Sequence, residues 1–310
     1  MIVVRITSGL GNQMFQYSFY LLMKKMYGDR TKVLCDVTWF NANNDHHGYE
    51  LERVFSYDGN ANFKIDKAGF SDLFKVTGIL PNSFGKIYEK IRRYPNRIIR
   101  EITGKSRKEY ILDQFSTDSF FEKILNLDVS KDYYITGFFI EEKYYLKAID
   151  EIKKALVFSE VTEEHNKIYF DEIQNTNSVS IHVRRGDYLS ETYRNQFISL
   201  GKDYYDKAID YITTRVDKPV FFIFSDDEEF VRHEFSSLEN KVIVTGNNGE
   251  QSYRDMQLMS LCKHNIIANS TFSQWGAILN SNEGHITIYP SQYLNGEDSE
   301  IKEADNWIRI

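Results

Sequence analysis

Short apolar segments rich in β-branched and aromatic residues alternate with helical patterns along the C-terminal half of the chain. Between two of them, Tyr205, Ala208 and Ile212 fall on one face of a helix. Strands that alternate with helices are typical of a parallel sheet with helices on both faces. We therefore predict a Rossmann-like domain here, with strands over residues 179–183, 220–224, 242–245, 266–268 and 286–289.

The N-terminal half opens with the same alternation. A strand is predicted over 2–6, an amphipathic helix follows, and a second strand is predicted over 32–36. Further along, the pattern predicts a strand over 133–139 and a long helix over 141–156. This half therefore also begins as a Rossmann-like domain.

A polar stretch from 160 to 177 separates the two halves, and we place the boundary between residues 165 and 166. The fold class is then α/β, with Rossmann-like domains over 1–165 and 166–310 facing each other across a cleft. The last segment of the chain is free to pack back on the first domain. Because α/β sheets bind ligands at the carboxyl ends of their strands, we expect the active site in that cleft.

Composition excludes several classes of protein. The net charge is −7, which repels a polyanion, so nucleic-acid binding is not expected. Cys35 and Cys262 are too few for a disulfide framework or a zinc site, and both are expected in the core as thiols. With no signal-peptide pattern and no apolar stretch of membrane-spanning length, we expect a cytoplasmic protein.

The first motif covers residues 7–13, Thr-Ser-Gly-Leu-Gly-Asn-Gln, directly after the first predicted strand. Its glycines allow a tight turn that meets a ligand closely, and the amides of Asn12 and Gln13 favour a loop that faces a substrate. A purely structural turn is the alternative. A dinucleotide site is another, but Met14 stands where its third glycine is needed, although Asp36 could contact a ribose.

The second motif covers residues 180–188, Ser-Ile-His-Val-Arg-Arg-Gly-Asp-Tyr. Arg184 and Arg185 follow a predicted strand, and guanidinium groups match phosphate oxygens bidentately. The pair therefore suits a diphosphate, and Asp187 could orient one of the two. A surface ion-pair cluster is the alternative.

Two further strand ends carry polar residues. Ser270 and Thr271 precede a predicted helix, where they can cap it, bind phosphate or do both. Asp226 and Asp227 follow another strand and can accept from a base or ribose, or cap the next helix. Since the sequence contains no Asp-x-Asp pair, no metal is expected.

Five segments together resemble the bacterial α-1,2-fucosyltransferases of glycosyltransferase family 11. The resemblance runs from the first strand to about Tyr293. It implies a GT-B architecture, metal independence, and inverting transfer of fucose from GDP-β-L-fucose to the 2-hydroxyl of a terminal galactose-like sugar. The segments are SGLGNQMFQYSF from Ser8, TGFFIEEKYY from Thr136, SIHVRRGDY from Ser180, FIFSDDEEF from Phe222 and YRDMQLMSLCKHNIIANSTFSQWGAIL from Tyr253.

The resemblance also implies residue roles. Arg184 and Arg185 grip the diphosphate, His182 and Asp226 read guanine or its ribose, and Gly11 and Asn12 face the reacting centre. The phosphate edge is served by Asn269, Ser270 and Thr271.

Some positions stay open. Asp187, Glu191 and Asp36 are the candidates for the catalytic base. We expect Arg184 and Asp187 to be catalytic residues. Ser8 and Gln274 depart from the family pattern, which often has a glycine and an aromatic residue there. An NAD-type oxidoreductase and a non-catalytic sugar-binding module remain the alternatives.

Residues 85–108 hold nine Lys and Arg but two Glu, a net charge of +7. One interpretation is a basic surface helix packed on the first domain. The other is peripheral contact with anionic lipid on the inner face of the cytoplasmic membrane, where a lipid-linked glycan acceptor would be met.

Liposome co-sedimentation tests the lipid interpretation. We expect binding that rises with anionic lipid, weakens with salt, and disappears when Arg92, Arg93, Arg97 and Arg100 become Glu. Equal, negligible pelleting of both forms at low salt would leave the basic surface helix.

Overall fold

The structure is a computed structural model in which the chain forms two compact units, Met1–Ser159 and Glu160–Ile310. The first unit ends six residues before the predicted boundary. The difference arises because α7 (Glu164–Asn175), which follows directly, packs on α10 (Tyr253–Leu261) of the second unit. The structure describes residues 1–43, 47–77, 111–115, 119–186, 188, 191, 195, 197–293 and 306–310.

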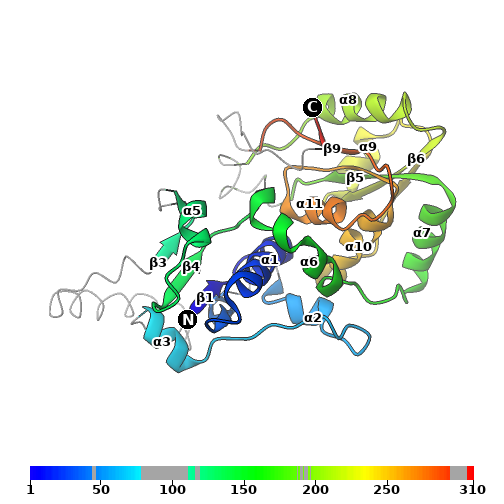
Figure 1. Cartoon of the computed structure of the whole chain (residues 1–310). Helices are drawn as coiled ribbons and strands as arrows, with labels where there is room; N and C mark the ends of the chain where they lie inside the picture. The colour runs from blue at the N-terminus through cyan, green and yellow to red at the C-terminus, as the bar shows by residue number, and fades with distance from the viewer. Residues whose placement is uncertain are drawn as a thin grey trace. The chain divides into compact units, whose positions relative to one another are not determined.

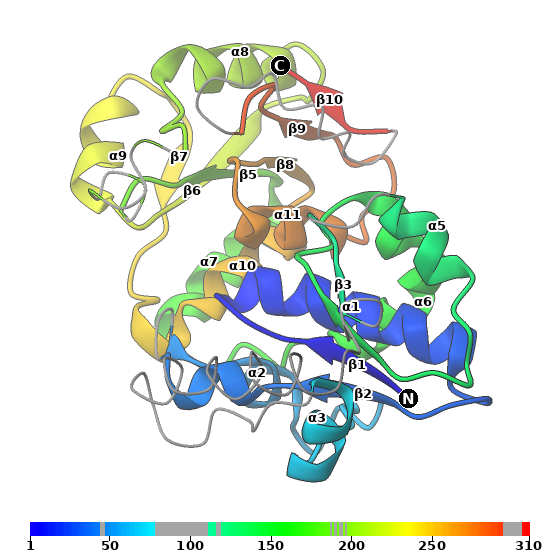
Figure 2. The same ribbon diagram turned by 90° about the vertical axis from the view of Figure 1, so that its left-hand side faces the viewer.

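The first unit is built on a parallel sheet in the order β2-β1-β4-β3 (Figures 1 and 2). Successive strand residues point to opposite faces, so Val3 packs with Leu73 and Val76 of α3 while Ile2 and Val4 face the other way, toward α1. The elements are β1 (Ile2–Arg5), α1 (Leu10–Tyr27), β2 (Val33–Asp36), η1 (Thr38–Asn41), α2 (Leu51–Phe55), α3 (Phe70–Thr77), β3 (Ile111–Asp113), α5 (Phe120–Leu125) and β4 (Tyr133–Thr136).

The long helix predicted over 141–156 is wrong. The chain instead makes two 3-10 turns, η4 (Glu142–Tyr144) and η5 (Leu146–Ala148), before α6 (Ile149–Ala155) begins. Tyr144 packs among aromatic rings, with its ring centroid 5.8 Å from that of Phe139 and 6.0 Å from that of Phe120. This tertiary contact outweighs the local helical pattern.

The second unit contains a parallel sheet in the order β10-β9-β8-β5-β6-β7. α8 and α9 pack on one face of it, and α7, α10 and α11 lie on the other (Figure 1). Its further elements are β5 (Asn177–Val183), α8 (Lys202–Thr213), β6 (Pro219–Ser225), α9 (Glu228–Glu234), β7 (Lys241–Ile243), η7 (Gly249–Gln251), β8 (His264–Ile266), α11 (Thr271–Ile278), β9 (Thr287–Tyr289) and β10 (Ile308–Arg309).

The end of the chain belongs to this second sheet. Ile308 and Arg309 pair with Ile288 and Tyr289 of β9. The expectation that the last segment packs back on the first domain is therefore wrong for residues 306–310, because the strand completes the edge of its own sheet.

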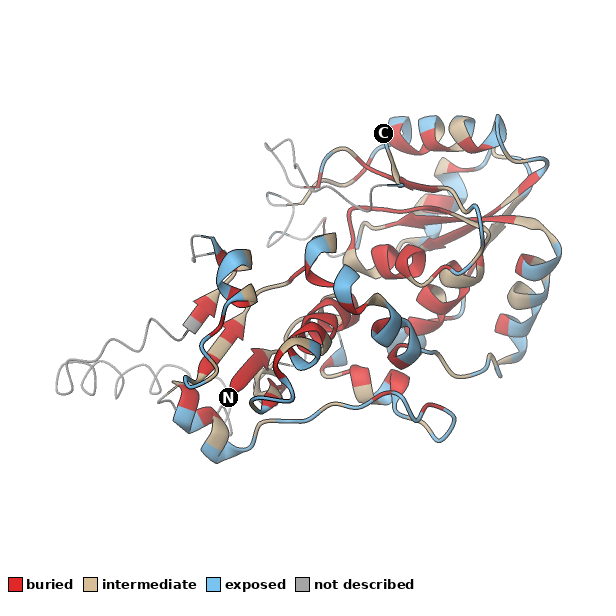
Figure 3. Cartoon of the chain, viewed as in Figure 1, coloured by how far each residue is buried: buried red, intermediate tan, exposed pale blue. Residues whose placement is uncertain are grey.

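Helices on both faces bury the central strands (Figure 3). Six of the seven residues of β5 are buried, as parallel sheets of this kind require. Cys35 and Cys262 are both buried thiols, as the sequence predicts.

The predicted lipid-binding segment 85–108 lies outside the described residues. Among the helices that the structure describes, none combines the length and apolar character needed to cross a bilayer.

Candidate functional site

Three neighbouring parallel strands of the second unit end at one edge of the sheet. β5 lies between β8 and β6, with Ile181 paired to Ile266 and Val183 to Ser225. The polar residues that follow these strands are therefore brought together, as the sequence predicts for adjacent carboxyl ends. Arg184 and Asp226 meet there.

Asp226 binds the chain that leaves β5. Its Oδ1 accepts hydrogen bonds from the backbone N of Arg185 at 3.0 Å and of Gly186 at 3.1 Å, and its Oδ2 lies 3.0 Å from Nη1 of Arg184. A Cβ on Gly186 would lie 2.9 Å from Oδ2 of Asp226, so a larger residue there would displace the Asp226 carboxylate. The resemblance implies that Asp226 reads guanine or its ribose; in the structure its carboxylate is engaged by Arg184, Arg185 and Gly186.

Arg185 turns toward α9. Its Nε lies 3.2 Å from Oδ2 of Asp227, and its guanidinium lies 3.6 Å from the centroid of the Phe230 ring. Asp227 in turn caps α9 by accepting from the backbone N of Phe230 at 3.0 Å. The guanidinium predicted to grip a diphosphate is thus held along the start of a helix. Asp187 lies outside the described residues.

His182 is buried on β5, with its ring centroid 5.8 Å from that of Phe272 on α11. Burial, with a contribution from the charge of Arg184, lowers the pKa of His182 to about 3, so the imidazole is neutral at pH 7. Its Nδ1 has no hydrogen-bond partner among the described residues. Buried polar atoms are rarely left unpaired, so this atom points to a ligand or a water molecule.

Asn269 and Ser270 shape the start of α11. Nδ2 of Asn269 donates to the carbonyl oxygens of Ile198 at 2.9 Å and Tyr293 at 3.0 Å, which fixes the amide. Its Oδ1 is a second buried atom that has no partner in the described part of the chain. Ser270 caps the helix through its hydroxyl. Thr271 is its first residue, at the positive end of the helix dipole.

A cavity of about 90 Å³ lies beside Asp226, at the carboxyl ends of β6 and β7. Asp255 of α10 lines it, and burial raises the pKa of this carboxyl to about 7. Nδ2 of Asn247, from the segment after β7, donates to Oδ1 of Asp255 at 2.8 Å. The sequence motifs did not identify Asp255 as a candidate site residue. The available signal was an acid in the first turn of a largely apolar helix.

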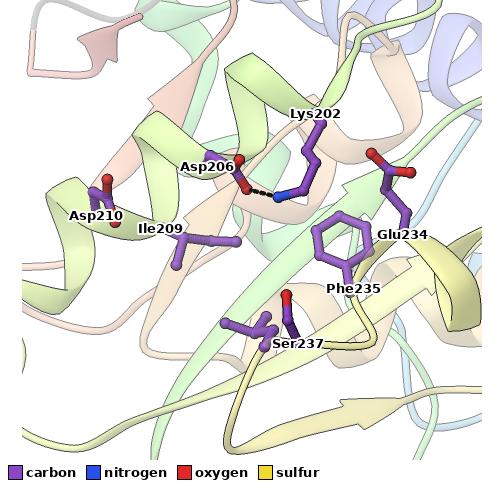
Figure 4. Close-up of a pocket in the computed structure, with 8 residues that line it drawn as sticks. Lys202, Asp206, Ile209, Asp210, Glu234, Phe235 and Ser237 are labelled. Carbon is purple, nitrogen blue, oxygen red and sulfur yellow. Dashed lines mark hydrogen bonds and ion pairs between the residues drawn. The ribbon is translucent and has the colours of Figure 1, made fainter.

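A second cavity, of about 260 Å³, lies between α8 and the end of α9 (Figure 4). Three carboxylates line it, from Asp206, Asp210 and Glu234, and Lys202 is paired with Asp206. The motif residues at the ends of β5, β6 and β8 do not line this cavity. The polar strand ends are therefore the better candidate site.

In the first unit, the motif over 7–13 is not the loop that the sequence predicts. α1 begins at Leu10, so Gly11 and Asn12 lie in its first turn. Gly11 is buried and Asn12 is half-buried. Asn12 therefore remains the member of this pair that can contact a ligand.

Gln13 braces this turn instead of facing a substrate. It is fully buried, and its Nε2 donates to the carbonyl oxygens of Ser8 and Gly48, both at 2.8 Å. Its Oε1 accepts from the backbone N of Glu50 at 2.9 Å, and the buried Glu50 carboxyl accepts from the backbone of Leu10. α1 has no acidic residue in its first turn, so Glu50 supplies that negative charge from elsewhere in the chain.

Asp36 does not offer the acid that a dinucleotide site would use. Its Oδ1 accepts from the backbone N and hydroxyl of Thr38 at 2.8 and 2.7 Å, and its Oδ2 accepts from the Tyr134 hydroxyl at 2.7 Å. Both oxygens are engaged, which disfavours the oxidoreductase alternative. Among the described residues, no three His, Cys, Asp or Glu side chains gather as a metal site would require.

Comparisons with known proteins agree with the sequence motifs. A model of glycosyl transferase family 11 matches residues 94–310. An α-1,2-colitosyltransferase of Escherichia coli is 29% identical, covering 100% of this chain and 98% of that protein. Galactoside α-(1,2)-fucosyltransferase 1 of Ateles belzebuth is also 29% identical, over 43% of this chain and 38% of its own length.

The fold is similar to that of a solved enzyme. The crystal structure of the selenomethionine form of the fucosyltransferase NodZ from Bradyrhizobium has a TM-score of 0.51 and 12% identity, covering 92% of this chain and 96% of that one. The fold is the GT-B type of α/β fold, as the motifs implied.

The raised pKa of Asp255 predicts a pH-dependent stability. The folded protein keeps a proton that an unfolded aspartate loses above about pH 4, so the free energy of unfolding falls as pH rises toward 7. Asp255→Asn removes this penalty and still accepts from Asn247. We expect the thermal midpoint of the variant, relative to wild type, to rise between pH 5 and pH 8; a difference that stays constant over this range would contradict the burial of an ionisable acid here.

Proposed function

The chain belongs to glycosyl transferase family 11, and we propose that it moves L-fucose from GDP-β-L-fucose to the 2-hydroxyl of a terminal galactose-like residue. It is a glycosyltransferase of GT-B fold. The observation that carries a nucleoside-diphosphate donor is Arg184, held by Asp226 at the strand ends where buried atoms of His182 and Asn269 have no partner among the described residues. The galactoside α-(1,2)-fucosyltransferase supports the sugar and the linkage.

Arg184 is the proposed diphosphate ligand. Asp226 fixes the guanidinium of Arg184 without burying it, since the Arg184 side chain is 26% exposed. The start of α11, with Ser270 and Thr271, adds the positive end of a helix dipole. These groups stabilise the negative charge that grows on the diphosphate as it leaves.

We propose that the guanine base binds at the cavity that Asp255 lines. Guanine presents N1–H and a 2-amino group on one edge, and a carboxylate accepts from both. His182 is neutral, so it contributes a hydrogen bond rather than a charge. We propose that it meets the nucleotide through the unpaired Nδ1.

The reaction exchanges one C–O bond for another. The acceptor hydroxyl oxygen bonds to the anomeric carbon of fucose as the bond from that carbon to the diphosphate oxygen breaks, and GDP leaves with the electron pair. Attack from the opposite face gives inversion. The hydroxyl proton passes to a base, for which Asp187 and Glu191 remain the candidates because both oxygens of Asp36 are engaged. Asn12 is proposed to meet the acceptor.

The E. coli relative favours a second donor. Colitose is fucose without its 3-hydroxyl, so GDP-colitose would use the same nucleotide contacts. An acceptor array offered both donors, with mass-spectrometric detection, separates the two because their products differ by one oxygen atom. Turnover of neither donor on galactose-terminated glycans, free or lipid-linked, would contradict the proposed activity and leave a non-catalytic sugar-binding module.

Arg184→Ala is expected to lower turnover about a hundredfold or more while the protein stays folded, with at most roughly 1 kcal/mol of stability lost with the partly exposed ion pair. Arg184→Lys should recover little, because an ammonium cannot replace the planar fork of the guanidinium. Turnover of Arg184→Ala above about a tenth of wild type would rule out the proposed contact with the leaving group.

Arg185→Ala is the matched control at the neighbouring position. It removes the contact with Phe230 and the pair with Asp227, so its main expected effect is a loss of roughly 1 kcal/mol of stability. Steady-state turnover and thermal melts of both variants test the different roles of the two arginines.

Metal independence is also proposed, because the charge stabilisation is supplied by Arg184 and α11. We expect equal turnover in excess EDTA and in added magnesium or manganese. A strict requirement for a divalent ion, restored by titration, would show that the diphosphate is held in another way.

A further inference from the structure

A buried hydrogen-bonded chain links α7 to Asp255. Asn166, which is fully buried, donates from Nδ2 to Oδ1 of Asn247 at 2.8 Å and accepts at its Oδ1 from Nδ2 of Asn247 at 2.9 Å. The same Nδ2 of Asn247 donates to Oδ1 of Asp255 at 2.8 Å. The side-chain amides of Asn166 and Asn247 therefore connect α7 to the Asp255 carboxyl, which lines the cavity.

The pairing determines which way the Asn247 amide points. Its oxygen lies 2.8 Å from Nδ2 of Asn166 and 3.2 Å from Nε2 of His165, which donates in the tautomer that carries a proton there. The amide nitrogen is left to face Asp255. In the opposite orientation two oxygens would face each other, so the partners on α7 hold Asn247 as a donor to Asp255.

The wall of the cavity rests on the same helix. The hydroxyl of Tyr169 accepts from the backbone N of Thr245 at 3.3 Å, and the ring of His165 would lie 3.0 Å from a Cβ on Gly246. Gly246 has a φ of +98°, in the region that favours glycine. The segment 245–247, which lines the cavity, thus packs closely against α7.

We propose that Asn166 is a positioning residue for nucleotide recognition, which acts through Asn247 to aim the Asp255 carboxyl into the cavity. The inference rests on the proposed function, in which the guanine of the donor occupies this cavity. In its ionised form, a carboxylate held in a fixed direction can accept from both N1–H and the 2-amino group of guanine. A carboxyl that can rotate keeps the contact with N1–H more readily than the added contact with the 2-amino group. Hypoxanthine lacks the 2-amino group, so Asn166 governs the preference for guanine over hypoxanthine.

The test compares GDP with IDP, which lacks the 2-amino group, by calorimetric titration of the full chain. Asn166→Leu removes both hydrogen bonds to Asn247 at similar volume. We expect the Kd for GDP to rise about tenfold and the Kd for IDP to change much less, so the preference for GDP falls. Asn175→Leu, at the exposed far end of α7, is the matched control and should keep the wild-type preference.

Asn166→Asp serves as a second variant if Asn166→Leu does not fold. It keeps the acceptor for Asn247 but loses the donor, and it should also lower the preference for GDP. An unchanged ratio of GDP to IDP affinity in a folded Asn166 variant would overturn this inference alone. Wild-type protein that binds neither nucleotide would overturn the proposed function together with it.

Discussion

The ion pair and hydrogen bonds of one carboxylate organise the candidate site. Asp226 stands at the end of β6 and binds two backbone amides and the guanidinium that follow β5. Charge-assisted hydrogen bonds of this kind are stronger and more directional than neutral ones. These contacts fix both the turn at Gly186 and the direction of the Arg184 side chain. They therefore hold the guanidinium in place at the strand ends.

Burial disfavours charge on two side chains near the strand ends, His182 and Asp255. The same desolvation lowers the pKa of His182 and raises that of Asp255, and in each case it favours the neutral form. Arg185 is occupied by Asp227 and Phe230. In the proposed site, Arg184 and the start of α11 supply the positive potential that a diphosphate needs, and His182, which burial keeps neutral, can add a hydrogen bond.

The sequence predicts the elements well where the pattern is local. The strands before Arg184 and Asp226 alternate with helices, and parallel topology then requires their ends to be neighbours. The partners of each side chain were not predictable, because they come from distant segments. Nothing in the sequence indicates that the Arg185 guanidinium stacks on the Phe230 ring, or that Gln13 donates to the carbonyl oxygen of Gly48.

Tertiary contacts also explain the elements that the sequence misplaced. The helical pattern after residue 141 is interrupted where Tyr144 enters an aromatic cluster, and Asp255 becomes a site residue when α7 supplies the amide that fixes Asn247. An acid in the first turn of a helix usually stabilises that helix by its charge. The position of Asp255 beside a cavity is visible only in three dimensions.

We propose that the nucleotide binds at the strand ends of the second unit. Hydrogen–deuterium exchange of the full chain with and without GDP tests it directly, because it locates protection along the sequence. We expect protection in peptides covering residues 184–186, 225–227, 244–248 and 268–272. Protection confined to the first unit, around residues 7–12 and Asp36, would contradict it.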